Sequence, residues 1–126
     1  VYIINHAQDR VLLFDRMFLP IVERIRPQLD SIEHFILFDA AAEGDYLSFR
    51  TLLDAEDGGF QWVALDERDP VGLCYTSGTT GNPKGVLYEH RSNVIHAITE
   101  IQPDVFDLSN RSVILPVVPM FHANSW

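Results

Sequence analysis

The stretch VLLFDRMFLPIVERIRPQLDSIEHFILF, residues 11–38, places a helical pattern between two short apolar runs. Residues 11–14 and 34–38 have the length and apolar content of buried strands, and Pro20 falls where the first turn of a helix tolerates proline. A strand, a helix and a strand in this order are typical of a right-handed crossover between parallel strands. The stretch therefore predicts an α/β fold with a mostly parallel sheet and flanking helices. Five apolar residues recur at helical spacing between the runs: Phe18, Ile21, Val22, Ile25 and Leu29.

The sequence on either side of this stretch is less regular. Residues 1–4, VYII, open directly in a strand-like apolar run, so we expect the chain to be an internal piece of a longer protein. Residues 40–70 are polar and rich in Asp, Glu and Gly, with one short helical pattern around Phe49. We expect this segment to be a surface excursion.

The second half of the chain predicts two further strands, a helix and a last strand. Residues 71–75 and 85–88 are apolar runs on either side of a loop. Ser92 is a candidate N-cap for a helix that ends before Pro103. Residues 113–118 predict a final buried strand.

Composition and charge exclude several classes of protein. The chain has 126 residues, 47% of them hydrophobic, and a formal net charge of -9, which argues against nucleic-acid binding. Cys74 is the only cysteine, so no intramolecular disulfide and no cysteine-based metal site can form from this chain alone, and a reducing, cytoplasmic setting fits best. No apolar run approaches the roughly 20 residues of a transmembrane helix.

Residues 75–85, YTSGTTGNPKG, have the composition of a phosphate-binding loop. They hold four Ser and Thr hydroxyls, three glycines and one lysine. Glycines let the backbone approach a ligand, amides and hydroxyls donate to phosphate oxygens, and the lysine adds a positive charge. The spacing is not that of a Walker A loop, because Lys84 does not directly follow a glycine. A Gly-rich hairpin whose threonines only cap turns is the structural alternative.

The run YTSGTTGNPKGV resembles the AMP-binding motif of acyl-CoA synthetases and related acid-activating ligases. Residues 115–126, LPVVPMFHANSW, look like the medium- and long-chain fatty-acid members. The resemblance implies that residues 1–126 are an incomplete piece of the large N-terminal domain of an adenylate-forming enzyme. Residues 1–70 would form the crossover and the surface excursion, and residues 71–126 the phosphate loop, a helix and an acyl-pocket strand.

The resemblance also implies a reaction and its site residues. A carboxylic acid, by this resemblance a medium- or long-chain fatty acid, reacts with ATP to give an acyl-adenylate, which coenzyme A converts to a thioester. Lys84 and His122 match catalytic residues, and Thr76 matches a residue near Mg²⁺. The isolated piece is expected to be inactive. The residues that match nucleotide- and substrate-binding positions are Thr76, Ser77, Gly78, Thr79, Thr80, Gly81, Lys84, Ala123 and Trp126.

Other interpretations remain open at this point. An aryl-acid or amino-acid adenylating relative would keep the same loop, and a nucleotide-binding module without turnover would keep it too. Taken without the family, His122 reads as an ordinary loop residue and Trp126 as a core residue. Glu89 stands where relatives commonly carry Ser or Thr. Expected partners are small molecules only, and a homodimer of the full-length enzyme is a further expectation.

Overall fold

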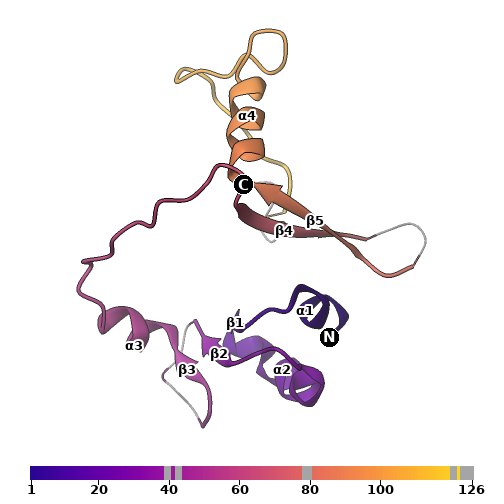
Figure 1. Ribbon diagram of the computed structural model, residues 1–126, viewed down its shortest axis with the longest axis vertical. Coiled ribbons are helices and arrows are strands. Elements are labelled where there is room, and N and C mark those ends of the chain that lie inside the picture. The colour runs from indigo at the N-terminus through magenta and orange to yellow at the C-terminus, as the bar shows by residue number, and fades with distance from the viewer. Residues whose placement is uncertain (39–40, 42–43, 78–80, 120–121, 123–126) are drawn as a thin grey trace. The chain divides into compact units, whose positions relative to one another are not determined.

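The computed structural model describes residues 1–126 except 39–40, 42–43, 78–80, 120–121 and 123–126. The chain divides into two compact units, Val1–Val63 and Ala64–Trp126, and each is described by itself (Figure 1). None of the helices in the described part of the chain has the length and apolar character needed to cross a bilayer.

The first unit contains the expected parallel sheet. Strands β1 (Val11–Phe14), β2 (His34–Leu37) and β3 (Leu47–Ser48) lie in the order β1-β2-β3, and both neighbouring pairs are parallel. Helix α2 (Leu19–Ile25) lies between β1 and β2 in the chain, flanked by the 3-10 turns η1 (Arg16–Phe18) and η2 (Arg26–Gln28). The strand, helix and strand predicted for residues 11–38 are therefore confirmed.

A small apolar core joins α2 to the sheet. Pro20 lies in the first turn of α2, as predicted, and Val22 on the same helix is 5% exposed. Leu37 of β2 is fully buried and belongs to the same core cluster as Val22. The ring of Tyr46 meets Phe14 and Phe35 edge to face, at centroid distances of 5.8 and 6.2 Å. Aromatic pairs prefer this geometry, so Tyr46 closes the core from the segment before β3.

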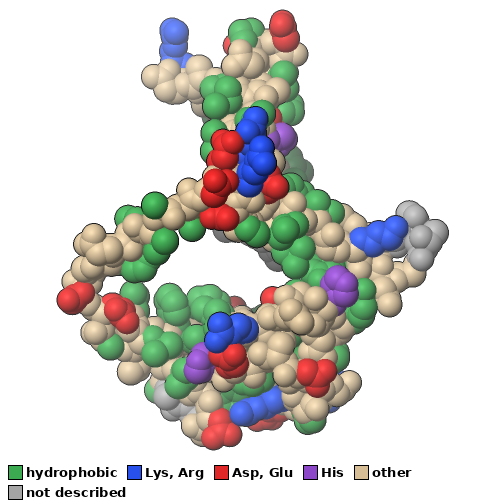
Figure 2. Space-filling view, in the orientation of Figure 1, with side chains coloured by type: hydrophobic (Ala, Val, Ile, Leu, Met, Phe, Trp, Pro, Cys, Tyr) green, Lys and Arg blue, Asp and Glu red, His purple; other side chains and the backbone are tan. Residues whose placement is uncertain are grey.

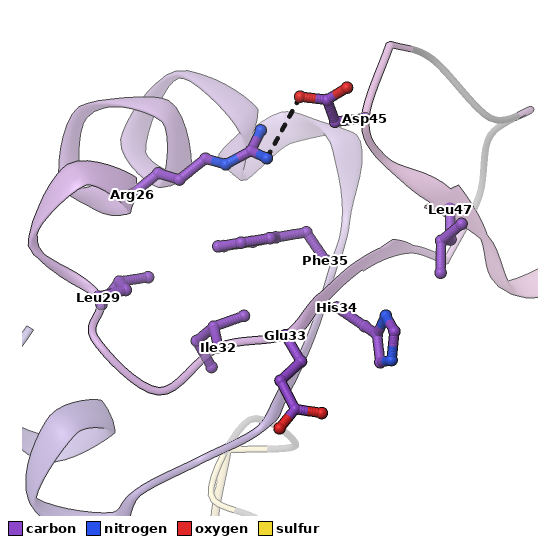
Figure 3. Close-up of a pocket in the computed structure, with 8 residues that line it drawn as sticks. All are labelled: Arg26, Leu29, Ile32, Glu33, His34, Phe35, Asp45 and Leu47. Atoms are coloured by element: carbon purple, nitrogen blue, oxygen red, sulfur yellow. Dashed lines mark hydrogen bonds and ion pairs between the residues drawn. The ribbon is translucent and has the colours of Figure 1, made fainter.

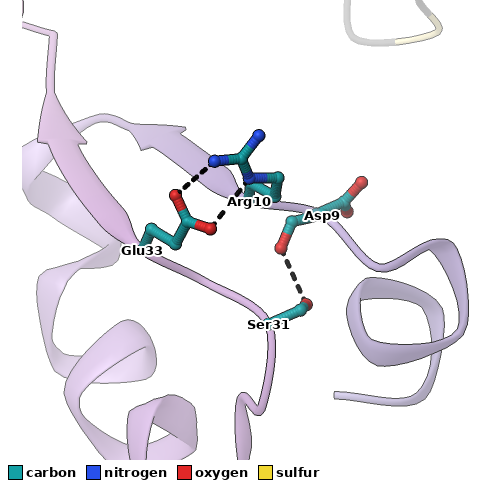
Figure 4. A network of polar contacts seen from close by, with 4 residues as sticks. All are labelled: Asp9, Arg10, Ser31 and Glu33. Carbon is teal, nitrogen blue, oxygen red and sulfur yellow. Dashed lines mark hydrogen bonds and ion pairs between the residues drawn. The ribbon is translucent and has the colours of Figure 1, made fainter.

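Polar contacts fasten the loop before β2 to the start of β1 (Figure 4). The guanidinium of Arg10 donates two hydrogen bonds to the carboxylate of Glu33, at 2.8 and 2.7 Å. The hydroxyl of Ser31 donates to the carbonyl of Asp9 at 2.7 Å. These contacts continue the β1–β2 pairing beyond the strands themselves.

Two expectations for this unit need correction. Residues 2–7 form helix α1 (Tyr2–Ala7) and not a strand, since local contacts such as the stack of Tyr2 on His6 stabilise a helical turn without a partner strand. The segment after residue 40 is not only a surface excursion, because it supplies β3 and the buried Tyr46. Ser48 then caps helix α3 (Phe49–Asp54), its hydroxyl accepting from the Thr51 amide.

The second unit is an antiparallel hairpin followed by a helix. Strands β4 (Pro70–Thr76) and β5 (Lys84–Glu89) pair antiparallel, and helix α4 (His90–Glu100) follows β5 directly. Both strands agree with the sequence prediction. The helix begins three residues earlier than expected, because Glu89 and not Ser92 is the N-cap residue.

The strand expected at residues 113–118 does not form. The structure gives these residues no strand pairing, and the side chains of Val113, Leu115 and Val117 are 99%, 85% and 87% exposed. An apolar run becomes a strand only where a neighbouring strand satisfies its backbone groups. Apolar side chains are also exposed on α4 and on the hairpin, and Figure 2 shows hydrophobic groups spread over the visible surface.

Substitution of Leu37 tests the core of the first unit. Leu37→Ala removes a fully buried side chain, and we expect the free energy of unfolding of the full-length protein to fall by about 2–5 kcal/mol. Leu53→Ala, at a side chain that is 54% exposed, is the matched control and should change it by about 0.5 kcal/mol or less. Equal losses in the two variants, measured by urea unfolding, would show that Leu37 is not a core residue.

The Arg10–Glu33 pair predicts a dependence of stability on pH. The hydrogen bond from Arg10 lowers the pKa of Glu33 below its ordinary value of 4.5. A carboxyl with a depressed folded-state pKa stabilises the fold fully above 4.5, and this contribution disappears as the pH falls through the folded-state pKa. Glu33→Gln should therefore flatten the fall in melting temperature between pH 5 and pH 3. Superimposable acid profiles for the two proteins would rule this out.

Candidate functional site: the β4–β5 loop

The hairpin brings the two ends of the hydroxyl-rich loop together. Thr76 is the last residue of β4, Lys84 is the first residue of β5, and the two are paired across the strands. Both side chains are exposed, as is that of Ser77. In the part of the chain that the structure describes, no carboxylate pairs with Lys84 and no side-chain hydrogen bond engages the Thr76 or Ser77 hydroxyl. These donors are therefore available to a ligand.

The remaining loop residues fall into two groups. Gly81 is described and has a φ of 127°, a conformation that L side chains rarely adopt. The glycine at this position is therefore required by the backbone. The predicted binding residues Gly78, Thr79 and Thr80 lie outside the described residues.

A second glycine lies in a tight contact. Gly85 lies opposite Tyr75, and a Cβ on Gly85 would come within 3.1 Å of Leu73 Cδ1 and 3.3 Å of Tyr75 Cζ. The absence of a side chain lets the Tyr75 ring lie against the backbone next to the Thr76–Lys84 pair. Sequence reasoning assigned no role to Tyr75 or Gly85. Tyr75 and Gly85 meet because of the antiparallel strand register. The sequence does not reveal this register, because the loop that connects the two strands is too long to define it.

The charge around the loop favours an anion. Residues 70–88 contain no Asp or Glu, although the chain carries 18 of them, and Lys84 is its only lysine. A lone ammonium group among hydroxyl and amide donors is a composition suited to phosphate oxygens. The excess of acidic over basic residues in the chain as a whole is therefore absent from the loop and its two strands up to Tyr88.

The Glu89 carboxylate caps helix α4 at the end of β5 that is distant from the loop. Its side chain accepts from the backbone amide of Ser92, and the Ser92 hydroxyl accepts from the Glu89 amide at 3.1 Å. The two side chains thus cap the first turn of α4 reciprocally. Because Glu89 lies at the end of the six-residue strand β5 that is distant from the loop, its charge is directed at the helix.

The donor set fits Mg²⁺ only through a bound phosphate. Among the residues that the structure describes, no group of three His, Cys, Asp or Glu could hold a metal ion. Thr76 offers a single hydroxyl oxygen, and Mg²⁺ commonly combines one or two protein oxygens with substrate phosphates and water. The expected role of Thr76 near Mg²⁺ is compatible with this chemistry.

The second predicted block is only partly described. His122 is exposed, and its backbone amide donates to the Pro119 carbonyl at 2.9 Å. Ala123 and Trp126 lie outside the described residues. Their predicted role beside the acid substrate stays a prediction.

The first unit has a cavity of about 330 Å³ whose charges are already paired (Figure 3). Arg26 and Asp45 form an ion pair at 3.4 Å, and the guanidinium lies 4.7 Å from the centroid of the Phe35 ring. Glu33 on its wall is engaged by Arg10. This cavity offers no free cation to a phosphate, so the loop of the second unit is the better candidate site.

The α/β fold and the acid-free, hydroxyl-rich loop are features of the adenylate-forming class of enzymes. The AMP-binding enzyme family matches residues 1–126, and the chain belongs to that family.

Two curated relatives align over nearly the whole chain. It is 53% identical over 132 residues to the 3-methylmercaptopropionyl-CoA ligase of Ruegeria pomeroyi, which covers 100% of this chain and 24% of the relative. It is 47% identical over 131 residues to the medium-chain-fatty-acid–CoA ligase of Ectopseudomonas oleovorans, covering 99% of this chain and 24% of the relative. The chain thus spans about a quarter of the length of these relatives.

A solved structure supports the fold. The crystal structure of the anthranilate CoA ligase AuaEII in complex with anthranoyl-AMP matches with a TM-score of 0.72 and 32% identity, over 77% of this chain and 19% of that one. The predicted fold class, part of an adenylate-forming α/β domain, is confirmed.

The contact between Gly85 and Tyr75 can be tested by adding a side chain. Gly85→Val should displace the Tyr75 ring and lower the free energy of unfolding by about 1–3 kcal/mol, the usual cost of overpacking. Gly72→Val is a control on the same hairpin, because a Cβ there meets nothing within 4 Å. If chemical denaturation gives the two variants the same stability, the close contact at Gly85 is not a constraint.

Proposed function

We propose that this chain supplies the nucleotide-phosphate loop of an enzyme that activates a carboxylic acid with ATP and transfers the acyl group to coenzyme A. The observation that carries the proposal is the pairing of Thr76 with Lys84 at the mouth of an acid-free loop, in a chain of the AMP-binding family. A hairpin whose threonines only capped turns would have no need of an exposed lysine there.

The proposed reaction has two steps. A carboxylate oxygen of the acid attacks the α-phosphorus of ATP, the bond to the β-phosphate oxygen breaks, and pyrophosphate leaves. The sulfur of coenzyme A then attacks the acyl carbonyl, and AMP leaves with the bonding electrons. Negative charge grows on pyrophosphate in the first step, so fixed donors around the β- and γ-phosphates lower its barrier.

The loop residues supply these donors. Lys84 brings the positive charge, and the hydroxyls of Ser77, Thr79 and Thr80 donate hydrogen bonds to phosphate oxygens. Gly78 and Gly81 allow the backbone amides to approach the same oxygens. Thr76 would contribute an oxygen to Mg²⁺, which supplies charge neutralisation on the phosphates when it is bound.

The acid side of the site belongs to the end of the chain. His122 would position the carboxylate, with Ala123 and Trp126 lining the passage to the acyl group. Support comes from the likeness of residues 115–126 to fatty-acid members of the family. A full-length enzyme with this role would act on small molecules in the cytoplasm, and a homodimer is consistent with the proposal.

Two substrate classes compete. A medium- or long-chain fatty acid is favoured by the second sequence block and by the medium-chain ligase among the relatives. A short thioether acid such as 3-methylmercaptopropionate is favoured by the higher identity, 53%, to the Ruegeria ligase. An aryl acid, as in the anthranilate ligase, is a weaker candidate at 32% identity.

Substitution of Lys84 tests the proposal. We expect Lys84→Ala in the full-length enzyme to reduce acid-dependent exchange of labelled pyrophosphate into ATP by about 10²–10³-fold, the effect of removing one charge-stabilising donor. Arg111→Ala, which removes another exposed cation of the same unit, is the control and should leave exchange unchanged.

The same assay separates the substrates. Acetate, 3-methylmercaptopropionate, octanoate, palmitate, benzoate and amino acids would be compared in the unsubstituted enzyme. Exchange that is fastest with octanoate or palmitate supports a fatty-acid ligase, and exchange that is fastest with the thioether acid supports the second candidate. A folded enzyme that exchanges with none of them would instead be a nucleotide-binding module.

A further inference from the structure

Gly85 is a glycine that its own backbone conformation does not require. It continues the extended strand β5, and it is not one of the described glycines with a positive φ, which are Gly44, Gly58 and Gly81. Glycine weakens a strand, because it has no side chain to pack and loses more backbone entropy on folding than other residues. A glycine inside a strand often marks the close approach of another group to its backbone.

The group that approaches Gly85 is the ring of Tyr75. The two residues are partners across β4 and β5, and a Cβ on Gly85 would lie 3.3 Å from Tyr75 Cζ and 3.5 Å from Tyr75 Cε1. Leu73 Cδ1 would lie 3.1 Å away, but it is the end of a flexible side chain and can rotate away. A ring that lies over a glycine of the facing strand fills the place of the missing side chain, which is the arrangement called aromatic rescue.

This contact is the direct neighbour of the Thr76–Lys84 pair. Thr76 follows Tyr75 on β4, Lys84 precedes Gly85 on β5, and the pairing is regular at this end of the hairpin. Successive side chains of a strand point to opposite faces, so the Tyr75 ring covers one face while Thr76 and Lys84 project from the other. The ring therefore supports from behind the backbone that carries the lysine, and a displacement at Gly85 passes to Lys84 through one peptide bond.

The tightness of the contact makes the position of β5 sensitive to it. A distance of 3.3 Å is shorter than the 3.4–4 Å of ordinary van der Waals contact, so an added Cβ would shift the ring or the strand by a few tenths of an ångström. A misplacement of about 1 Å in an active site can cost about 100-fold in rate. A shift of a few tenths at the base of a phosphate loop is therefore large enough to measure.

We propose that Tyr75 is a positioning residue for the phosphate loop, whose ring lies against Gly85, fixes the backbone of β5 at the loop end and so sets where the Lys84 ammonium meets the phosphates of ATP. Tyr75 acts through Gly85 and Lys84 and does not have to touch the nucleotide. The role of Lys84 rests on the function proposed above, whereas the contact between the ring and the glycine does not.

The test is the effect of Gly85→Val in three backgrounds of the full-length enzyme. In the unsubstituted background we expect the Michaelis constant for ATP in pyrophosphate exchange to rise about tenfold and that for the acid to stay unchanged. Tyr75→Phe keeps the ring, so Gly85→Val should raise the constant by the same factor there. Tyr75→Ala frees the space, and the rise should be at least about threefold smaller, as for residues that are coupled by contact.

Equal rises in the three backgrounds would overturn the proposal. Gly85 would then make room for something other than the ring, such as a ligand or another segment of the enzyme. A loss of folded protein lowers the maximal rate and leaves both Michaelis constants unchanged, so it cannot imitate the expected result. If Gly85→Val does not fold, Gly85→Ala in the same three backgrounds is the milder substitution and decides the proposal by the same comparison.

A contact at the open end of the same hairpin provides the control. Arg91 Nη1 donates to Glu67 Oε1 at 2.6 Å, on the far side of the irregularity in the strand pairing from the loop. Arg91→Met should therefore leave the Michaelis constant for ATP unchanged. A rise as large as that of Gly85→Val would show that the loss of any contact in the hairpin has this effect, and would overturn the particular role of Tyr75.

Urea unfolding of the same variants tests the contact without the function. Gly85→Val should lower the urea midpoint more in the unsubstituted and Tyr75→Phe backgrounds than in Tyr75→Ala. Midpoints that depend on the background together with a Michaelis constant for ATP that does not would overturn the positioning role. Absence of exchange in the unsubstituted enzyme would count against the proposed function alone, and the dissociation constant for Mg-ATP would then replace the Michaelis constant in the comparison.

Discussion

The pairing of β4 with β5 is the constraint on which the candidate site depends. The hydroxyl of Thr76 and the ammonium of Lys84 are eight positions apart in the sequence, and only the antiparallel ladder brings their backbones side by side. Each end of this ladder has its own fixing contact. Tyr75 against Gly85 holds the loop end, and Glu67 with Arg91 holds the open end. Residues 77–83, which connect the two strands, therefore do not have to hold the strands together and can adopt a conformation that suits a ligand.

The same ladder separates opposite charges. The carboxylates of residues 66–69 lie beyond the open end of β4, and the lysine lies at the loop end. Six residues of extended strand span about 20 Å, whereas charges in water at physiological ionic strength are screened over about 8 Å. A chain with a net charge of -9 can thus present a locally cationic loop to a polyanion. Overall charge argues against nucleic acid as a partner without excluding a nucleotide.

Sequence predicted those elements whose signal is local. The two parallel strands, α2 with its early proline, and both strands of the hairpin follow from short apolar runs and helical spacing. Predictions failed where pairing decides the outcome. Residues 1–4 and 113–118 are both apolar runs, yet the first belongs to the start of helix α1 and the second is unpaired, because a strand requires a partner that no local pattern reveals. The start of α4 was misplaced because Glu89 and Ser92 both have capping side chains, and the choice between them depends on where β5 ends.

The comparisons bear on which part of the site recognises the nucleotide and which recognises the acid. The relatives are named for acids as different as a short thioether acid and medium-chain fatty acids, and the solved structure is that of an anthranilate ligase. Both curated relatives align with this chain across the hairpin, since each covers 99% or more of it. A hairpin that lies within the aligned region of ligases named for such different acids fits the proposed role of the loop, which is to stabilise the charge that moves onto pyrophosphate. Under the proposed function, discrimination between acids comes from pocket shape, because a methylene in an apolar pocket changes specificity while a phosphate contact does not. Residues 115–126 are the segment of this chain that the proposal assigns to the acid side.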